Sequence, residues 1–207
     1  MAAERGKIDH LHRQNYQTCL LSSFAVVGNY FINEQIELFF HDYYREYIAD
    51  FNLHNVAYLW PQFGLCQSGH INYLGQCTSR SGYRILFDLY TNSQQRIFNL
   101  CRESFNAELI RLDITTGNIT NGTFNNTHIN AFLRDTTKNS IINVFINNHD
   151  RRLYGHIWDR IAMHSLTVYF DNGFYFHDTG NPQNDIPLQE NWWNFARIGD
   201  ILLYWEK

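Results

Sequence analysis

The sequence has no long apolar segment and no excess of positive charge, and each absence excludes a class of protein. No uninterrupted apolar stretch approaches the roughly 20 residues of a membrane-spanning helix. The first ten residues also lack the apolar core of a secretory signal. The net charge of −4 gives no general attraction to nucleic acid or to anionic membranes. We therefore expect a cytoplasmic chain that binds neither, or one translocated into a target cell without a cleaved signal peptide.

Cysteine is also scarce, with 4 in 207 residues, which is too few for a disulfide framework. We expect reduced thiols. Cys66, His70 and Cys77 are close in sequence, but their spacing matches no paired Cys-x2-Cys zinc motif. His10 and His12 are spaced as a metal pair, yet further ligands are missing nearby. We therefore expect no metal site and no cofactor.

The composition predicts one folded domain over residues 1–207. Hydrophobic residues make up 44% of the chain, which is enough for a substantial core, and charged residues make up 17%, which is too few for a disordered protein. No linker rich in proline, glycine or serine divides the sequence.

Hydrophobic periodicity places helices first and strands last. It predicts helices over 19–31, 34–49, 92–109 and 127–138, and a short strand over 84–90. Later strands are expected over 140–146, 164–170, 174–178 and 200–205, and loops over 52–82 and 113–126. The predicted fold class is α+β, with an antiparallel sheet packed against the helix that begins near Cys19.

The segment 14–19 is polar and precedes an apolar run, which predicts a loop that places Cys19 in the first turn of a helix. The N-terminus of a helix has unpaired N–H groups and about half a positive charge, both of which favour a thiolate. Such a cysteine needs a base. Segment 164–178 alternates polar and apolar residues around a turn, so it predicts a β-hairpin with His164 near one end and Asp178 near the other.

The length of the hairpin loop decides which residue can orient His164. One possibility is a three-residue loop at 171–173 with Gly173 left-handed, in which case the numbers of two residues that face each other across the hairpin add up to 344. Asp178 is then the diagonal neighbour of His164 on the same face of the sheet. With a two-residue loop, His177 or Thr179 takes that place. Asn181, or an asparagine within 191–194, is then the substitute orienter.

Cys19, His164 and Asp178, in this order and on these elements, resemble the papain-like superfamily of cysteine peptidases, most closely its C39-like branch. The resemblance implies that Cys19 is the nucleophile, His164 the base and Asp178 the orienter. It also implies that Gln14 contributes to the oxyanion hole, a role for which Gln17 is the alternative. His156 is the alternative base.

This resemblance implies a hydrolase that cleaves an amide bond in a protein or peptide, of the kind found among bacterial effectors and toxins. The same fold also carries glutamine deamidases and thiol acyltransferases, which differ in the leaving group or in the acceptor. A non-catalytic module that binds a protein through the loops of 52–82 is the alternative from another class.

Overall fold

The structure is a computed structural model that describes residues 6–10, 19–32, 82–92, 94, 96–146, 164–195 and 201–207. The helix expected over 34–49 and most of the loop-rich segment 52–82 lie outside these ranges. Within them, no helix is both long and apolar enough to cross a membrane.

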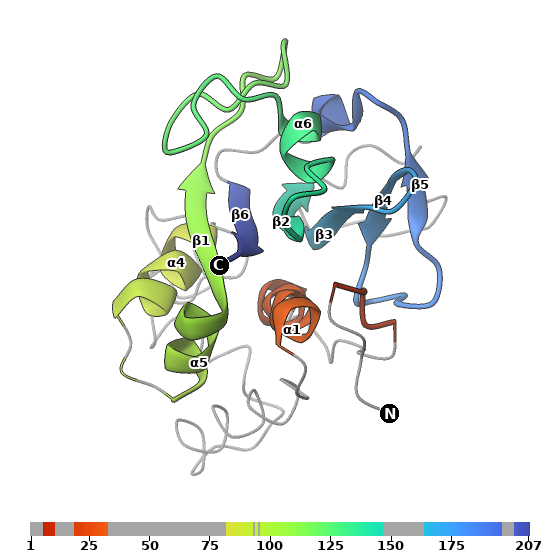
Figure 1. Cartoon of the computed structure of the whole chain (residues 1–207). Helices are drawn as coiled ribbons and strands as arrows, with labels where there is room; N and C mark the ends of the chain where they lie inside the picture. The colour runs from red at the N-terminus through yellow and green to blue at the C-terminus, as the bar shows by residue number, and fades with distance from the viewer. Residues whose placement is uncertain are drawn as a thin grey trace, which may run out of the picture.

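A six-stranded antiparallel sheet forms the centre of the described structure, with the strand order β1-β6-β2-β3-β4-β5 (Figure 1). The strands are β1 (Phe105–Ile110), β2 (Ser140–Ile146), β3 (His164–Phe170), β4 (Phe174–His177), β5 (Ile186–Leu188) and β6 (Ile201–Glu206). The helices are α1 (Cys19–Phe31), α4 (Gly82–Asn92), α5 (Arg96–Ser104) and α6 (Ile129–Leu133), with a 3-10 turn, η2 (Trp192–Phe195). The α+β class and the antiparallel sheet are therefore as predicted.

Each face of the sheet buries its own apolar core. Alternate residues of one strand face opposite sides, so Ile141 packs in a first core with α1, α4 and α5, whereas Ile142 packs in a second core with α6 and η2. Leu202 and Leu203 of β6 divide in the same way. Figure 1 shows α1 and α6 on opposite sides of β2 and β3.

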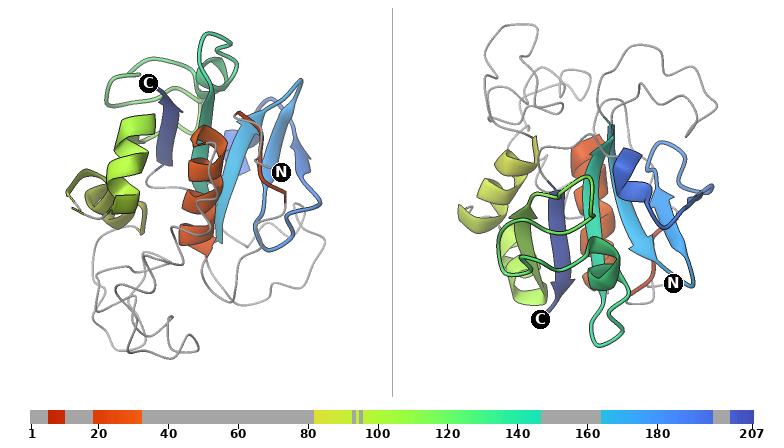
Figure 2. Two further views of the ribbon diagram at one scale, coloured as in Figure 1. Left: turned by 60° about the horizontal axis from the view of Figure 1, so that its bottom comes forward. Right: turned by 90° about the horizontal axis from the view of Figure 1, so that it is seen from above.

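Helix α1 lies on the sheet along β3 (Figure 2). Buried hydroxyl groups join the two elements. Ser165 Oγ on β3 donates to Ser23 Oγ on α1 over 2.9 Å, and the Tyr83 hydroxyl on α4 lies 2.6 Å from Ser165 Oγ. The helix that begins at Cys19 is thus packed against the late antiparallel strands, as predicted.

The hairpin between β3 and β4 has the register predicted for a three-residue loop. Phe170 pairs with Phe174 and Thr167 pairs with His177, so opposed numbers add up to 344. The two-residue alternative is wrong. The left-handed residue is Asn172, with φ 54°, rather than Gly173. Asparagine tolerates this region better than most residues with a side chain, because its short amide forms local hydrogen bonds.

Three sequence predictions between residues 84 and 138 are wrong. Segment 84–90 belongs to helix α4, where Tyr83, Leu86 and Tyr90 are buried at helical spacing against the first core. The next helix ends at Ser104, because the residues from Phe105 onward pair with β6 as β1. The helix expected over 127–138 spans only Ile129–Leu133.

Candidate functional site

Cys19 is the first residue of α1. The first N–H groups of a helix have no partner within the helix, and its N-terminus carries a partial positive charge. The backbone therefore places Cys19 where a thiolate is favoured. The structure describes the backbone of Cys19 but not its side chain. The residues Gln14, Gln17 and His156 lie outside the described ranges.

His164 is the first residue of β3, and its backbone is paired with Ile146 of β2. Alternate residues of a strand belong to the same face of the sheet. Backbone position 164 therefore belongs to the face of Leu166 and Val168, which pack in the second core, whereas Ser165 is on the face that contacts α1. The His164 side chain is not among the described ones. Its pairing with Cys19 stays a prediction.

Asp178 directly follows β4 and is 6% exposed. Its Oδ1 accepts a hydrogen bond from the Gly180 backbone N–H over 2.7 Å, and its carbonyl accepts one from the Asn181 N–H over 2.9 Å. The carboxylate therefore stabilises the turn that leaves the hairpin. An orienting role for Asp178 stays a prediction as well.

A second group of polar side chains lies on the α1 side of the sheet and comprises His10, Tyr169, His177 and Asp185. We call it the Asp185 cluster. His177 Nδ1 lies 2.8 Å from Asp185 Oδ1, and His10 Nε2 lies 2.8 Å from Asp185 Oδ2. The Tyr169 hydroxyl donates to the same Oδ2. One carboxylate thus holds together two imidazoles and a phenol from separate segments.

The Asp185 cluster is largely closed to solvent. The His177 side chain is fully buried, that of Asp185 is 10% exposed and that of His10 is 48% exposed. His177 Nε2 is buried, and no hydrogen-bond partner for it occurs in the described ranges. An unsatisfied buried polar atom costs about 1–3 kcal/mol, which makes this nitrogen unusual for a purely structural residue.

Burial alone would raise the pKa of Asp185. The hydrogen bonds from His177, Tyr169 and His10 outweigh this effect and lower the pKa of the carboxyl group. Burial raises the pKa of Tyr169, and the hydrogen bond to Asp185 and its charge add to the rise. Asp185 is therefore a carboxylate and Tyr169 a neutral phenol near neutral pH.

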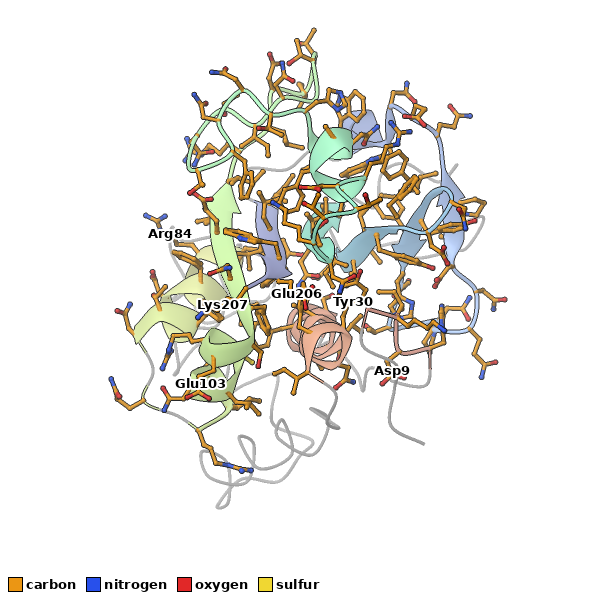
Figure 3. The ribbon with its side chains drawn as sticks, viewed as in Figure 1. Asp9, Tyr30, Arg84, Glu103, Glu206 and Lys207 are labelled. Atoms are coloured by element: carbon orange, nitrogen blue, oxygen red, sulfur yellow. The ribbon has the colours of Figure 1, made fainter. Side chains whose placement is uncertain are left out.

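The Asp185 cluster and Cys19 lie toward opposite ends of α1. The Asn29 amide, near the last residues of α1, donates to Asp9 over 2.9 Å, and Asp9 is adjacent to His10 in the chain. At this end the Gly6 N–H also donates to the Tyr30 carbonyl over 2.9 Å. Figure 3 shows Asp9 beside α1.

Cys19 is instead one helical turn before Ser23, which contacts Ser165 near the start of β3. Helix α1 therefore runs in the same direction as β3. The backbones of Cys19 and His164 lie toward one end, and the Asp185 cluster lies toward the other.

The sequence pattern does not predict the Asp185 cluster. It groups His10 only with His12, and it marks neither Asp185 nor Tyr169 as a candidate. The local signal is weak: Asp185 is a carboxylate directly before β5 (Ile186–Leu188), and His177 is the last residue of β4. Only the paired strands bring these residues together.

Comparison with known proteins finds no match: no protein-family model, no curated protein and no solved structure matches the chain. The assignment of a function therefore depends on the residues described above.

Proposed function

We propose that the chain is a cysteine hydrolase with a papain-like, C39-like fold that acts on an amide bond of a protein or peptide. The observation that carries the proposal is the position of Cys19 as the first residue of α1, at the end of the helix that lies toward the start of β3 and His164. A nucleophilic thiolate needs a nearby positive potential and a base. The start of α1 supplies the positive potential, and His164, whose backbone lies toward the same end of the sheet, is the proposed base.

In the proposed reaction, His164 takes the proton of the Cys19 thiol, and the sulfur attacks the carbonyl carbon. The N–H groups at the start of α1, with Gln14, stabilise the negative charge that develops on the carbonyl oxygen. The carbon–nitrogen bond then breaks, and the amine leaves with the proton from His164. Water, deprotonated by His164, attacks the thioester, which releases the carboxylic acid and restores the Cys19 thiol.

The hairpin register supports Asp178 as the residue that orients His164. In this register the numbers of paired residues add up to 344. If the pairing continues by one residue beyond Thr167 and His177, Asp178 is the diagonal neighbour of His164. His177 is less suitable for this role because its Nδ1 is bonded to Asp185. Thr179 has no carboxylate with which to orient an imidazole.

The rate of alkylation of Cys19 as a function of pH tests the proposal. An imidazolium and the helix N-terminus both lower the pKa of a thiol, so we expect Cys19 to react with iodoacetamide well below the usual thiol pKa of about 8.5. His164→Ala should move the midpoint of this profile upward, and Asp178→Asn should move it less. Cys101, which is fully buried, is the internal reference.

A Cys19 profile near that of a free thiol, unchanged in His164→Ala, would remove Cys19 as the nucleophile and favour a non-catalytic binding module. Given a reactive Cys19, intact-mass analysis of candidate substrates identifies the leaving group. Backbone cleavage indicates a peptidase, and a gain of about one dalton indicates a glutamine deamidase with the same nucleophile.

A further inference from the structure

We propose that His10, His177 and Asp185 bind a divalent transition-metal ion of the zinc class, and that this ion fixes the N-terminal segment to the sheet. This inference goes beyond the proposed hydrolase and does not depend on it. The three side chains come from residues 6–10, from β4 and from the chain before β5.

The geometry of the ligand atoms carries the proposal. One ligand atom from each of the three residues lies within 4.8 Å of the other two. In a tetrahedral zinc site with bonds of about 2.1 Å, ligand atoms lie about 3.4 Å apart. The imidazole rings of His10 and His177 have centroids 5.3 Å apart and are nearly perpendicular, at 84°. The three ligand atoms are therefore already gathered in one place, as binding to a single ion requires.

The surroundings of Asp185 also match those of a metal ligand. In metal sites the ligating side chains are held by further hydrogen bonds, which fix their orientation. The Tyr169 hydroxyl donates to Asp185 Oδ2 and can keep this bond while the other oxygen ligates. His10 is half exposed, so the site is open to solvent on one side, from which water can supply the fourth ligand.

The ligand set selects the class of ion. Two imidazole nitrogens and one carboxylate suit zinc and neighbouring transition metals. Calcium and magnesium prefer six or more oxygen ligands, which one carboxylate does not supply. None of the three ligand atoms is sulfur, so this site also differs in its ligands from a zinc site formed by Cys66, His70 and Cys77.

The position of the site argues for a structural role. Cys19 lies about 6 Å before Ser23 along α1, and Thr167, which pairs with His177, lies about 7 Å beyond Ser165 along β3. The ion would therefore lie more than about 10 Å from Cys19 along this direction. It would join His10 to Asp185, which is 175 residues away in the chain.

Cobalt and zinc titrations of the full chain test the proposal, after treatment with a chelator and removal of the chelator. We expect His10-dependent binding of one equivalent of cobalt, with visible absorption typical of low coordination and without the charge-transfer band of thiolate ligands. His10→Ala should weaken zinc binding at least tenfold. At a zinc concentration of 100 times Kd, the wild-type Tm should rise by about 5–10 °C, and that of His10→Ala should not.

His128→Asn is the matched control. His128 caps α6 by accepting a hydrogen bond from the Asn130 N–H, and asparagine is also a favourable capping residue. This variant should bind zinc like the wild type. His10 is half exposed, so its replacement should leave the fold intact. The proposal would be overturned if His10→Ala bound zinc as tightly as the wild type. It would also be overturned if the only metal signal were a thiolate band in the cobalt spectrum that persists in His10→Ala.

Discussion

Ser165 on β3 donates a hydrogen bond to Ser23 on α1, and both hydroxyl groups are buried. Tyr83 joins the same group from α4. Ser165→Ala removes the central hydroxyl while the other two remain buried. We expect the free energy of unfolding to fall by about 1–3 kcal/mol, the cost of disrupting buried polar groups. Urea unfolding followed by tryptophan fluorescence measures the change.

The control for this substitution is Thr136→Ala, which removes an exposed hydroxyl. It should change the free energy of unfolding by no more than about 0.5 kcal/mol. Equal effects of the two variants would mean that the hydrogen bonds between β3 and α1 contribute nothing to stability.

Alkaline pH should destabilise the fold through its buried tyrosines. Burial, with the charges of Glu206 and Asp171, raises the pKa of Tyr30 to about 12, whereas an unfolded tyrosine titrates near 10. Between these values the unfolded chain has released a proton that the folded chain still holds. The stability is therefore complete below about pH 10 and declines as the pH rises toward 12, by up to about 1.4 kcal/mol per pH unit for this residue.

Urea midpoints at pH 8, 9, 10 and 11 measure this dependence. Tyr30→Phe should reduce the decline between pH 10 and 11, because phenylalanine has no proton to lose. Burial also raises the pKa values of Tyr90 and Tyr204, so part of the decline should remain. Identical slopes in the wild type and in Tyr30→Phe would contradict the prediction.

Cys101 should resist alkylation while the chain is folded. It lies on α5 in the first core, and burial raises the pKa of its thiol well above the usual range. At pH 8 the thiol is protonated and covered, so iodoacetamide should modify it only in urea. Peptide mass mapping with and without urea measures this difference, and equal modification rates would show that α5 does not cover the sulfur.

Gly117 should not tolerate a side chain. Its φ is 73°, and an added Cβ would lie 2.7 Å from Trp193 Cε2 and 2.8 Å from His128 Nε2. The left-handed backbone costs alanine about 1–2 kcal/mol, and the contact with the indole adds to this. We expect Gly117→Ala to lower the free energy of unfolding by about 2–4 kcal/mol.

Gly173→Ala is the matched control for Gly117→Ala. Its nearest neighbour would be Tyr175 at 3.5 Å, an ordinary contact, and its φ is not in the left-handed region. This variant should be nearly neutral in the same urea titration. A loss of stability as large as that of Gly117→Ala would contradict the structural difference between the two positions.

Strands β2 and β3 were predictable because their β-branched and aromatic residues form short runs beside turn residues. Helix α4 was not, since 84–90 is too short for periodicity to separate a helix from a strand. Strand β1 depends on its pairing with β6, far later in the chain. The local sequence does not indicate a partner strand so far along the chain, so it predicts that the preceding helix continues through Phe105.

The same limit applies to the candidate sites. Cys19 could be placed at a helix N-terminus because a polar segment before an apolar run is a local signal. The Asp185 cluster joins residues 10, 177 and 185, which come together only through the hairpin register and the position of the N-terminal segment. No spacing rule connects them in the sequence.

The position of β6 has a consequence for synthesis on the ribosome. The last strand of this sequence lies between β1 and β2, inside the sheet (Figure 1). Until residues 201–206 leave the exit tunnel, neither β1 nor β2 can form its pairing with β6. Open strand edges invite pairing with other chains. The nascent chain should therefore depend on chaperones until β6 has been synthesised, and removal of β6 should cause aggregation of the chain.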